Sequence, residues 1–375
     1  MTNPQDSLPE QNKKTENEIQ QDIARNQGQA IGQMYGGQAV DAGIFISGGS
    51  IVFQNSEGSS LPQSLLNVQR EIPSLLPYLP NRTDQEFELG QAIQILFAKT
   101  PRQPLVCIVH GDEFQSHDKF LERLCKVSLP RLLRLDPKRT AIKEYHLGWP
   151  SSLKRLNNLS ERLCKNLADT VENYSLATAQ QINQTFIKCP GVSVVHMHLL
   201  TDDWQNLGFD LLPNVLDFWQ HWPDLQYEQI LVICIFIKYQ AKHPIKLQKW
   251  YWLFNPIIQL RRFLRRRHYN KLNHKIHQQI KVLSESEFNK YNRLTGVVLP
   301  KLDNLTQSHV EDWVRCEATK TFVGEAVLEQ LIDAVRDMFD YWEIQTALRT
   351  MSMDDVALRL IKLLKAPFVD KEEHL

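Results

Sequence analysis

The residues best placed for phosphate chemistry follow an apolar run at 104–109, which ends in His110 and Gly111. A buried strand, a loop and a helix form the setting of the pattern G-x-x-x-x-G-K-[ST] in nucleotide-binding proteins. There the loop amides hold phosphate, the lysine neutralises its charge and the hydroxyl binds Mg²⁺. The aligned residues in this chain are Gly111, Ser116, His117 and Asp118. Only the first glycine of the pattern is present, so the sequence predicts a degenerate phosphate-binding loop.

The charges around this loop are wrong for a triphosphate. The amino end of a helix attracts anions, but here Asp112, Glu113 and Asp118 surround it. His117 stands where the lysine would be, and a neutral imidazole, with an ordinary pKa of about 6.5, does not restore that charge. We expect the loop to repel nucleotide.

A carboxylate at the end of a neighbouring strand is the second requirement for nucleotide hydrolysis. The apolar run 230–237 supplies none and continues into Lys238. We therefore predict that the chain is not an enzyme and has no catalytic residue, cofactor or small-molecule substrate. The alternative is a divergent NTPase that uses other residues.

His196 and His198 lie two residues apart, which places them on one face of a strand, and Asp202 and Asp203 follow. Histidines at this spacing can bind a metal. Their separation from the aspartates matches no hydrolase pattern, and helices should cover the strand. The sequence favours a structural strand end, and no metal site is predicted.

The segment 229–284 contains twelve Lys or Arg and no acidic residue, whereas the rest of the chain has 31 basic and 43 acidic residues. We expect a basic helical insertion at 242–284 whose cations are solvated. A protein partner, an anionic membrane and nucleic acid are alternative partners for 242–281. The interaction candidates are Trp250, Trp252, Arg261, Arg262, Arg265, Arg266, Arg267 and Lys271.

The elements that position these residues alternate between strand and helix. Strands are predicted at 104–110, 192–200, 230–237 and 296–299, and helices near 116–124, 152–173, 176–188 and 211–222. Another helix should begin at a capping box, Thr83-Asp84-Gln85-Glu86. Such alternation predicts an α/β fold with the layout of a P-loop NTPase: a mostly parallel sheet flanked by helices.

Both ends of the chain differ from this pattern. Helices are predicted at 308–316, 323–346 and 353–365, the last one capped by Ser352. Residues 1–27 are polar and expected to be disordered, and the glycine-rich stretch 28–58 is interpreted as a linker, with a β-hairpin as the alternative. The predicted domains are an N-terminal segment 1–60, an α/β domain 61–320 and a C-terminal helical extension 321–375.

The composition is that of a soluble globular protein, with 42% apolar and 23% charged residues and a formal net charge of zero. No signal peptide is recognisable, and no apolar run reaches the roughly 18 residues of a membrane span, so we expect a cytoplasmic protein. The six cysteines form no C-x-x-C pair and are interpreted as buried reduced thiols.

The segments 105–113 and 117–123 resemble the degenerate P-loop region of inactive STAND domains, non-catalytic relatives of the signal-transducing NTPases. The segments 235–239, 298–302 and 309–314 agree with this resemblance, as do the glycine repeats at 28–53. It covers about 104–315 and implies a scaffold module in bacterial multidomain signalling or conflict systems, where it would bind protein partners.

Overall fold

The computed structural model describes residues 43–47, 50–54, 71–100, 102–136, 141–150, 153, 155–172, 176–188, 191–226, 229–240, 256–286 and 288–365. The predicted disorder of 1–27 lies outside these residues, as do Trp250 and Trp252. The chain forms two compact units, 1–66 and 67–375. The predicted domain limits at 60 and 320 remain predictions.

The glycine-rich stretch forms a hairpin. Strands β1 (Gly43–Ser47) and β2 (Ser50–Gln54) pair in antiparallel fashion, with Ile46 opposite Ile51 and Ser47 opposite Ser50. The interpretation as a linker is wrong for these residues, and the hairpin alternative is correct. The two residues between the strands in the sequence are Gly48 and Gly49, a pair that is typical of hairpin connections.

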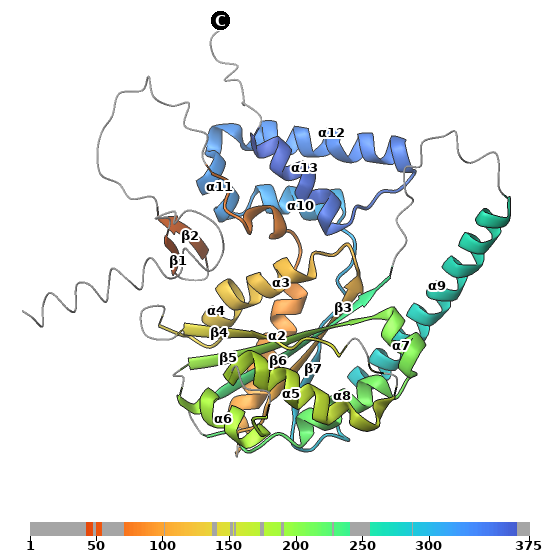
Figure 1. The fold of residues 1–375 in the computed structure, drawn as a ribbon. Coiled ribbons are helices and arrows are strands. Elements are labelled where there is room, and N and C mark those ends of the chain that lie inside the picture. The colour runs from red at the N-terminus through yellow and green to blue at the C-terminus, as the bar shows by residue number, and fades with distance from the viewer. Residues whose placement is uncertain are drawn as a thin grey trace, which may run out of the picture. The chain divides into compact units, whose positions relative to one another are not determined.

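The larger unit is built on a five-stranded parallel sheet in the order β4-β5-β6-β3-β7 (Figure 1). Its strands are β3 (Leu105–Asp112), β4 (Ala141–His146), β5 (Gly191–Leu200), β6 (Ile230–Tyr239) and β7 (Thr295–Val298). The predicted fold class, a parallel sheet flanked by helices, is confirmed. The strand that leads into the degenerate loop, β3, lies between β6 and β7.

Helices cover both faces of the sheet because its strands are apolar on both sides. Val106 and Ile108 of β3 pack on one helical layer, whereas Leu105, Cys107 and Val109 pack on the other. The first layer contains α5 (Leu159–Glu172), α6 (Ala179–Lys188), α7 (Thr201–Leu207), α8 (Leu211–Gln220) and α9 (Pro256–Glu285). The second contains α2 (Thr83–Ala98) and a continuous helical run made of α3 (His117–Arg123), a π-helical turn (Leu124–Ser128) and α4 (Leu129–Leu132).

The sequence prediction missed strand β4. Its side chains are mostly exposed because β4 is an edge strand, so Lys143 and Glu144 interrupt the apolar pattern that identified the other strands. The predicted capping box of α2 is wrong as well: the N-cap is Arg82, and no side chain caps the helix. Helix α7, directly after β5, was also not predicted.

The C-terminal part is helical, as predicted, and consists of α10 (Gln307–Val314), α11 (Glu317–Val323), α12 (Leu328–Thr346) and α13 (Met353–Lys365). The expected helix at 323–346 is broken at Gly324, whose φ of 87° interrupts it. Ser352 caps α13 by accepting from the Asp355 amide. Trp313 of α10 donates to the Leu76 carbonyl at 2.8 Å. In the described part, no helix has both the length and the apolar character that crossing a bilayer requires.

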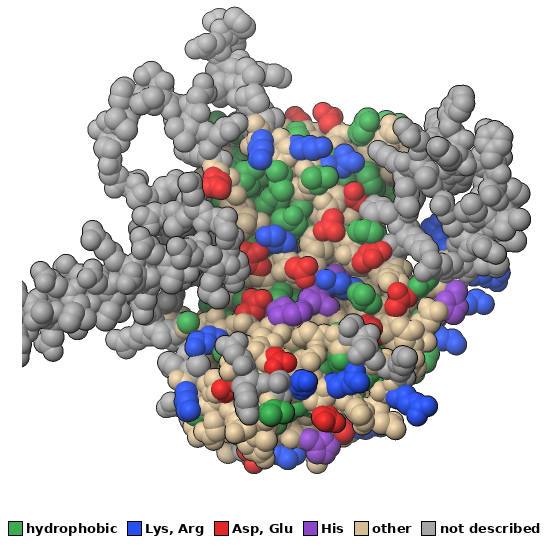
Figure 2. Space-filling model, in the orientation of Figure 1, with side chains coloured by type: hydrophobic (Ala, Val, Ile, Leu, Met, Phe, Trp, Pro, Cys, Tyr) green, Lys and Arg blue, Asp and Glu red, His purple; other side chains and the backbone are tan. Residues whose placement is uncertain are grey.

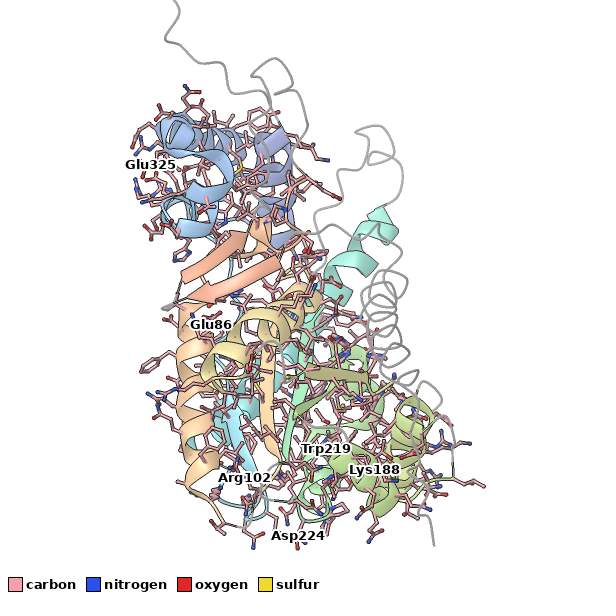
Figure 3. All side chains as sticks on the ribbon, turned by 90° about the vertical axis from the view of Figure 1, so that its left-hand side faces the viewer. Glu86, Arg102, Lys188, Trp219, Asp224 and Glu325 are labelled. Carbon is pink, nitrogen blue, oxygen red and sulfur yellow. The ribbon has the colours of Figure 1, made fainter. Side chains whose placement is uncertain are left out.

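A buried carboxylate joins α2 to the helical run that follows the loop. Glu86, labelled in Figure 3, accepts from Arg123 at 2.7 Å, Arg131 at 2.6 Å and the Ser128 hydroxyl at 2.8 Å. Burial alone would raise the pKa of Glu86, but Arg123, Ser128 and Arg131 outweigh it and hold the pKa below its ordinary value. Glu86 is therefore ionised at neutral pH and fixes the second helical layer.

We predict that Glu86→Gln lowers the free energy of unfolding at pH 7 by about 2–4 kcal/mol, because two arginines lose their anionic partner. Glu88→Gln, on the same helix, is the control and should have little effect. The lowered pKa of Glu86 stabilises the fold above the ordinary carboxylate pKa, and this contribution is lost as the pH falls through the folded-state pKa. In urea unfolding the wild type and Glu86→Gln should therefore converge toward low pH; a constant difference would contradict the prediction.

Candidate functional site

The degenerate loop is a tight turn between β3 and α3. Strand β3 continues through Gly111 and Asp112, which pair with Lys238 and Tyr239 of β6. The Glu113 amide donates to the Tyr239 carbonyl at 2.9 Å, and the Gln115 amide to the Asp112 carbonyl at 3.1 Å. Because these two amides donate to backbone carbonyls of the protein, they are not free to bind a phosphate.

Ser116 precedes α3 in the left-handed conformation, with φ of 50° and ψ of 49°. It occupies the N-cap position, but its hydroxyl does not cap α3, although serine is a favoured N-cap residue. The hydroxyl contacts the Asp354 carboxylate of α13 instead. The Asp354 amide donates to the Phe114 carbonyl at 3.1 Å. The C-terminal helices thus hold the loop from outside.

Gly111 has no free space beside it. A Cβ atom at this position would lie 2.8 Å from both the Cβ and the carbonyl oxygen of Leu302. The Leu302 amide donates to the His110 carbonyl at 2.8 Å, so the segment after β7 continues the sheet pairing across the end of β3. Leu302 is fully buried. Leu302 therefore packs directly against the first residue of the loop.

His117, at the lysine position of the motif, points into the protein. It is 1% exposed, its Nε2 lies 3.0 Å from the Asp112 carbonyl oxygen, and its ring packs edge-on against Phe236. Burial, against the opposing effect of the Asp112 carbonyl, lowers the pKa of His117 to about 4. His117 is therefore neutral at physiological pH, in agreement with the expectation that it does not supply the lysine charge.

Asp118, at the position of the metal-binding hydroxyl, has partners within the protein. Its carboxylate lies 3.4 Å from Lys238 Nζ and 3.3 Å from His198 Nε2. Burial would raise the pKa of Asp118, but the charge of Lys238 and its hydrogen bond to the carboxylate hold the pKa below its ordinary value. The end of β6 therefore contributes a cation, Lys238, to the neighbourhood of the loop.

The aspartates after β5 do not join the histidines. Asp202 accepts from the Tyr269 hydroxyl and from Gln240 Nε2, and Asp203 accepts from the Leu200 amide at 2.7 Å. Burial raises the pKa of Asp203. Both carboxylates have structural roles around α7 and α9.

Strand β4 brings a third histidine to His196 and His198. His146, the last residue of β4, pairs in register with His196, and one ring nitrogen of each of the three histidines lies within 4.8 Å of the others. Figure 2 shows histidine side chains near the middle of the molecular face, with acidic and basic side chains around them. Sequence reasoning missed His146 because it missed β4, and only the recognition of this edge strand would have pointed to His146.

The basic segment forms the continuous helix α9. Tyr269, Ile276 and Ile280 bury one face of this helix, and Asn273 and Gln279 bond to Thr201 and Trp204 of α7. On the other face the described cations are exposed: Arg266, Arg267, Lys271 and Lys275. The side chains of Arg261, Arg262 and Arg265 lie outside the described part of α9.

Comparison with protein families now adds to this geometry. Residues 77–237 match the family model described as inactive STAND. The resemblance stated from the sequence is confirmed over this stretch, which contains β3, the degenerate loop, β5 and most of β6. A comparison with curated proteins finds no match.

Solved structures with a similar arrangement are distant. The Aeropyrum pernix ORC1 protein, solved in complex with DNA, has 11% identity and a TM-score of 0.35, and the match covers 78% of this chain and 61% of that one. Domain III of the Thermotoga maritima replication initiation protein DnaA has 13% identity and a TM-score of 0.26, with 79% and 99% covered. These values are too low to transfer binding or activity.

We predict that Gly111→Ala lowers the free energy of unfolding by about 1–3 kcal/mol, because the added methyl group overlaps the Leu302 backbone and side chain. Gly148→Ala is the matched control, since nothing lies within 4 Å of a Cβ at that position. Chemical denaturation of both variants without nucleotide measures the difference. Equal stabilities would mean that Leu302 moves aside easily and that the loop can open.

Proposed function

We propose that this chain is a non-catalytic regulatory or scaffold module of the STAND type, which binds protein partners in the cytoplasm during bacterial signalling or conflict response. The observation that carries the proposal is the close packing of Leu302 against Gly111. It leaves no room for additional atoms beside the first residue of the loop. The match of 77–237 to the inactive STAND family supports the same conclusion.

Electrostatics at the loop favour this proposal over a divergent NTPase. A triphosphate needs cations, but His117 is neutral and buried, and Lys238 is already paired with Asp118. Asp112 and Glu113 add acidic side chains to the same loop. Nucleotide would lose hydration without gaining the charge-assisted hydrogen bonds that offset this loss.

We predict that isothermal titration calorimetry of the wild type with Mg²⁺ and ATP or GTP gives no binding heat. The variant Ser116→Gly, His117→Lys, Asp118→Thr restores the residue types of the motif and should also fail to bind. It should be less stable by about 2 kcal/mol or more, because the restored lysine enters a buried position. The single variant Ser116→Gly is the control: it relieves the left-handed conformation but removes the hydroxyl contact with Asp354, so its stability should change less than that of the triple variant.

Micromolar nucleotide binding by the wild type would overturn the proposal. Binding by the triple variant alone would show that the loop is open and lacks only the motif residues, which contradicts the role given to Leu302.

A second candidate function is binding to an anionic surface through α9. Among the residues that the structure describes, no ion pair joins Arg266, Arg267, Lys271 or Lys275 to an acidic side chain, and all four are exposed. An acidic partner inside the described part of the protein therefore does not account for these cations. Unpaired cations on one helix face favour phosphate groups, either of lipids or of nucleic acid.

We predict that the combined substitution of Arg266, Arg267 and Lys271 by Glu abolishes such binding in either case, without unfolding the protein, since these side chains are exposed. Sedimentation with phosphatidylserine vesicles and a salt-titrated DNA mobility shift distinguish the two surfaces. Trp250→Ser with Trp252→Ser should weaken only membrane binding, because base-independent phosphate contacts do not need the indoles. If the wild type binds neither vesicles nor DNA, α9 has only the structural role of packing on α7.

A further inference from the structure

Three imidazoles from two neighbouring strands meet at the carboxyl end of the sheet, beside the start of α3. His146 ends β4, and His196 and His198 share one face of β5. One ring nitrogen from each lies within 4.8 Å of the other two. We propose that His146, His196 and His198 form a binding site for a divalent transition metal, with Zn²⁺ as the best-fitting ion. This metal-site proposal does not depend on whether the chain binds nucleotide.

The spacing of the rings suits a shared ion. His146 Nδ1 and His196 Nδ1 lie 3.5 Å apart. Zinc binds histidine nitrogen at about 2.0–2.1 Å, so two nitrogens on one tetrahedral ion are roughly 3.3–3.4 Å apart. Small side-chain movements would bring the third imidazole to the same ion. Imidazole ligands select zinc and its neighbours over Mg²⁺ or Ca²⁺, which prefer oxygen.

Two of the histidines also have carboxylates on their other ring nitrogen. His196 Nε2 lies 3.2 Å from Glu144, and His198 Nε2 lies 3.3 Å from Asp118. His198 Nδ1 is buried and has no hydrogen-bond partner. Histidine ligands of metals commonly donate one N–H to a carboxylate and coordinate through the other nitrogen. The carboxylates fix this tautomer before any metal arrives.

The charges around the cluster are compatible with a cation. Lys238 is the cation that faces the cluster from β6, and its charge is offset by Asp118 and Glu144.

A metal here would add a further link between β4, β5 and α3. Strand β4 lies at the edge of the sheet and, among the described residues, pairs with β5 alone. Coordination by His146 would link this edge strand to β5, and Asp118 would extend the link to the first turn of α3. Three protein ligands leave a fourth position for water or for a ligand of a partner, since His146 is exposed.

The test uses the full chain, stripped with a chelator and then titrated with ZnCl₂ in a calorimeter. We expect one strong site per chain and a higher midpoint of thermal unfolding with Zn²⁺. His146→Gln should weaken binding at least tenfold and abolish the thermal shift, while its metal-free midpoint stays close to that of the wild type because His146 is exposed. Glu144→Gln retains all three ligands and should weaken binding about 10–100-fold.

His221→Gln is the control, because His221 is an exposed histidine that bonds to Asp217 at the end of α8. It should bind Zn²⁺ like the wild type. Titration with Co²⁺ should give the visible absorption of a tetrahedral nitrogen site in the wild type and not in His146→Gln. No Zn²⁺ binding by the wild type, or equal binding by His146→Gln, would overturn the proposal and leave His146 and His196 as a hydrogen-bonded pair.

Discussion

The contact between Gly111 and Leu302 constrains the sheet, the loop and the C-terminal helices around the end of β3. Because Gly111 lacks a side chain, the backbone of Leu302 approaches close enough for its amide to reach the His110 carbonyl. The segment after β7 is thereby fixed against the end of β3, where the degenerate loop begins. The same segment leads directly into α10, so the C-terminal helices start from a fixed point on the sheet. A side chain at 111 would disturb the sheet, the loop and these helices together.

Filling this position with protein requires partners for the polar groups of the loop. Gln115, 1% exposed, donates to Asn304 at 2.7 Å and accepts from Arg82 at 3.2 Å. Burial, with a smaller effect of Arg123, lowers the pKa of Arg82 to about 10, so Arg82 remains charged. Its charge is directed to the Asn81 carbonyl and to Gln115. The segment before α2, the loop and the segment after β7 therefore share one hydrogen-bond network.

The sequence predicted the parts of this fold that depend on continuous apolar runs. Strands β3, β5 and β6 are buried on both faces, so their residues are apolar throughout and were recognised. Edge strand β4 has mostly exposed side chains, and Lys143 and Glu144 interrupt its apolar pattern, so it was not recognised as a strand. The loss of the phosphate-binding residues was also readable, because it depends only on residue types at fixed spacing. The packing of Leu302 against the loop could not be predicted from the sequence. Leu302 lies 191 positions from Gly111 in the chain, and no local pattern predicts such a contact.

Asp118 shows how the two candidate sites are physically joined. At the hydroxyl position of a phosphate-binding loop, a side chain would face Mg²⁺ and the phosphates. Here the carboxylate lies between Lys238 of β6 and His198 of β5. The acidic residue that makes the loop unfavourable for nucleotide is therefore the same one that orients an imidazole of the histidine cluster. A neutral hydroxyl at this position would leave Lys238 without its counter-charge, and that cation would then oppose a metal ion on His198. In the two proposals, the same carboxylate therefore disfavours a triphosphate at the end of β3 and favours a metal ion at the ends of β4 and β5.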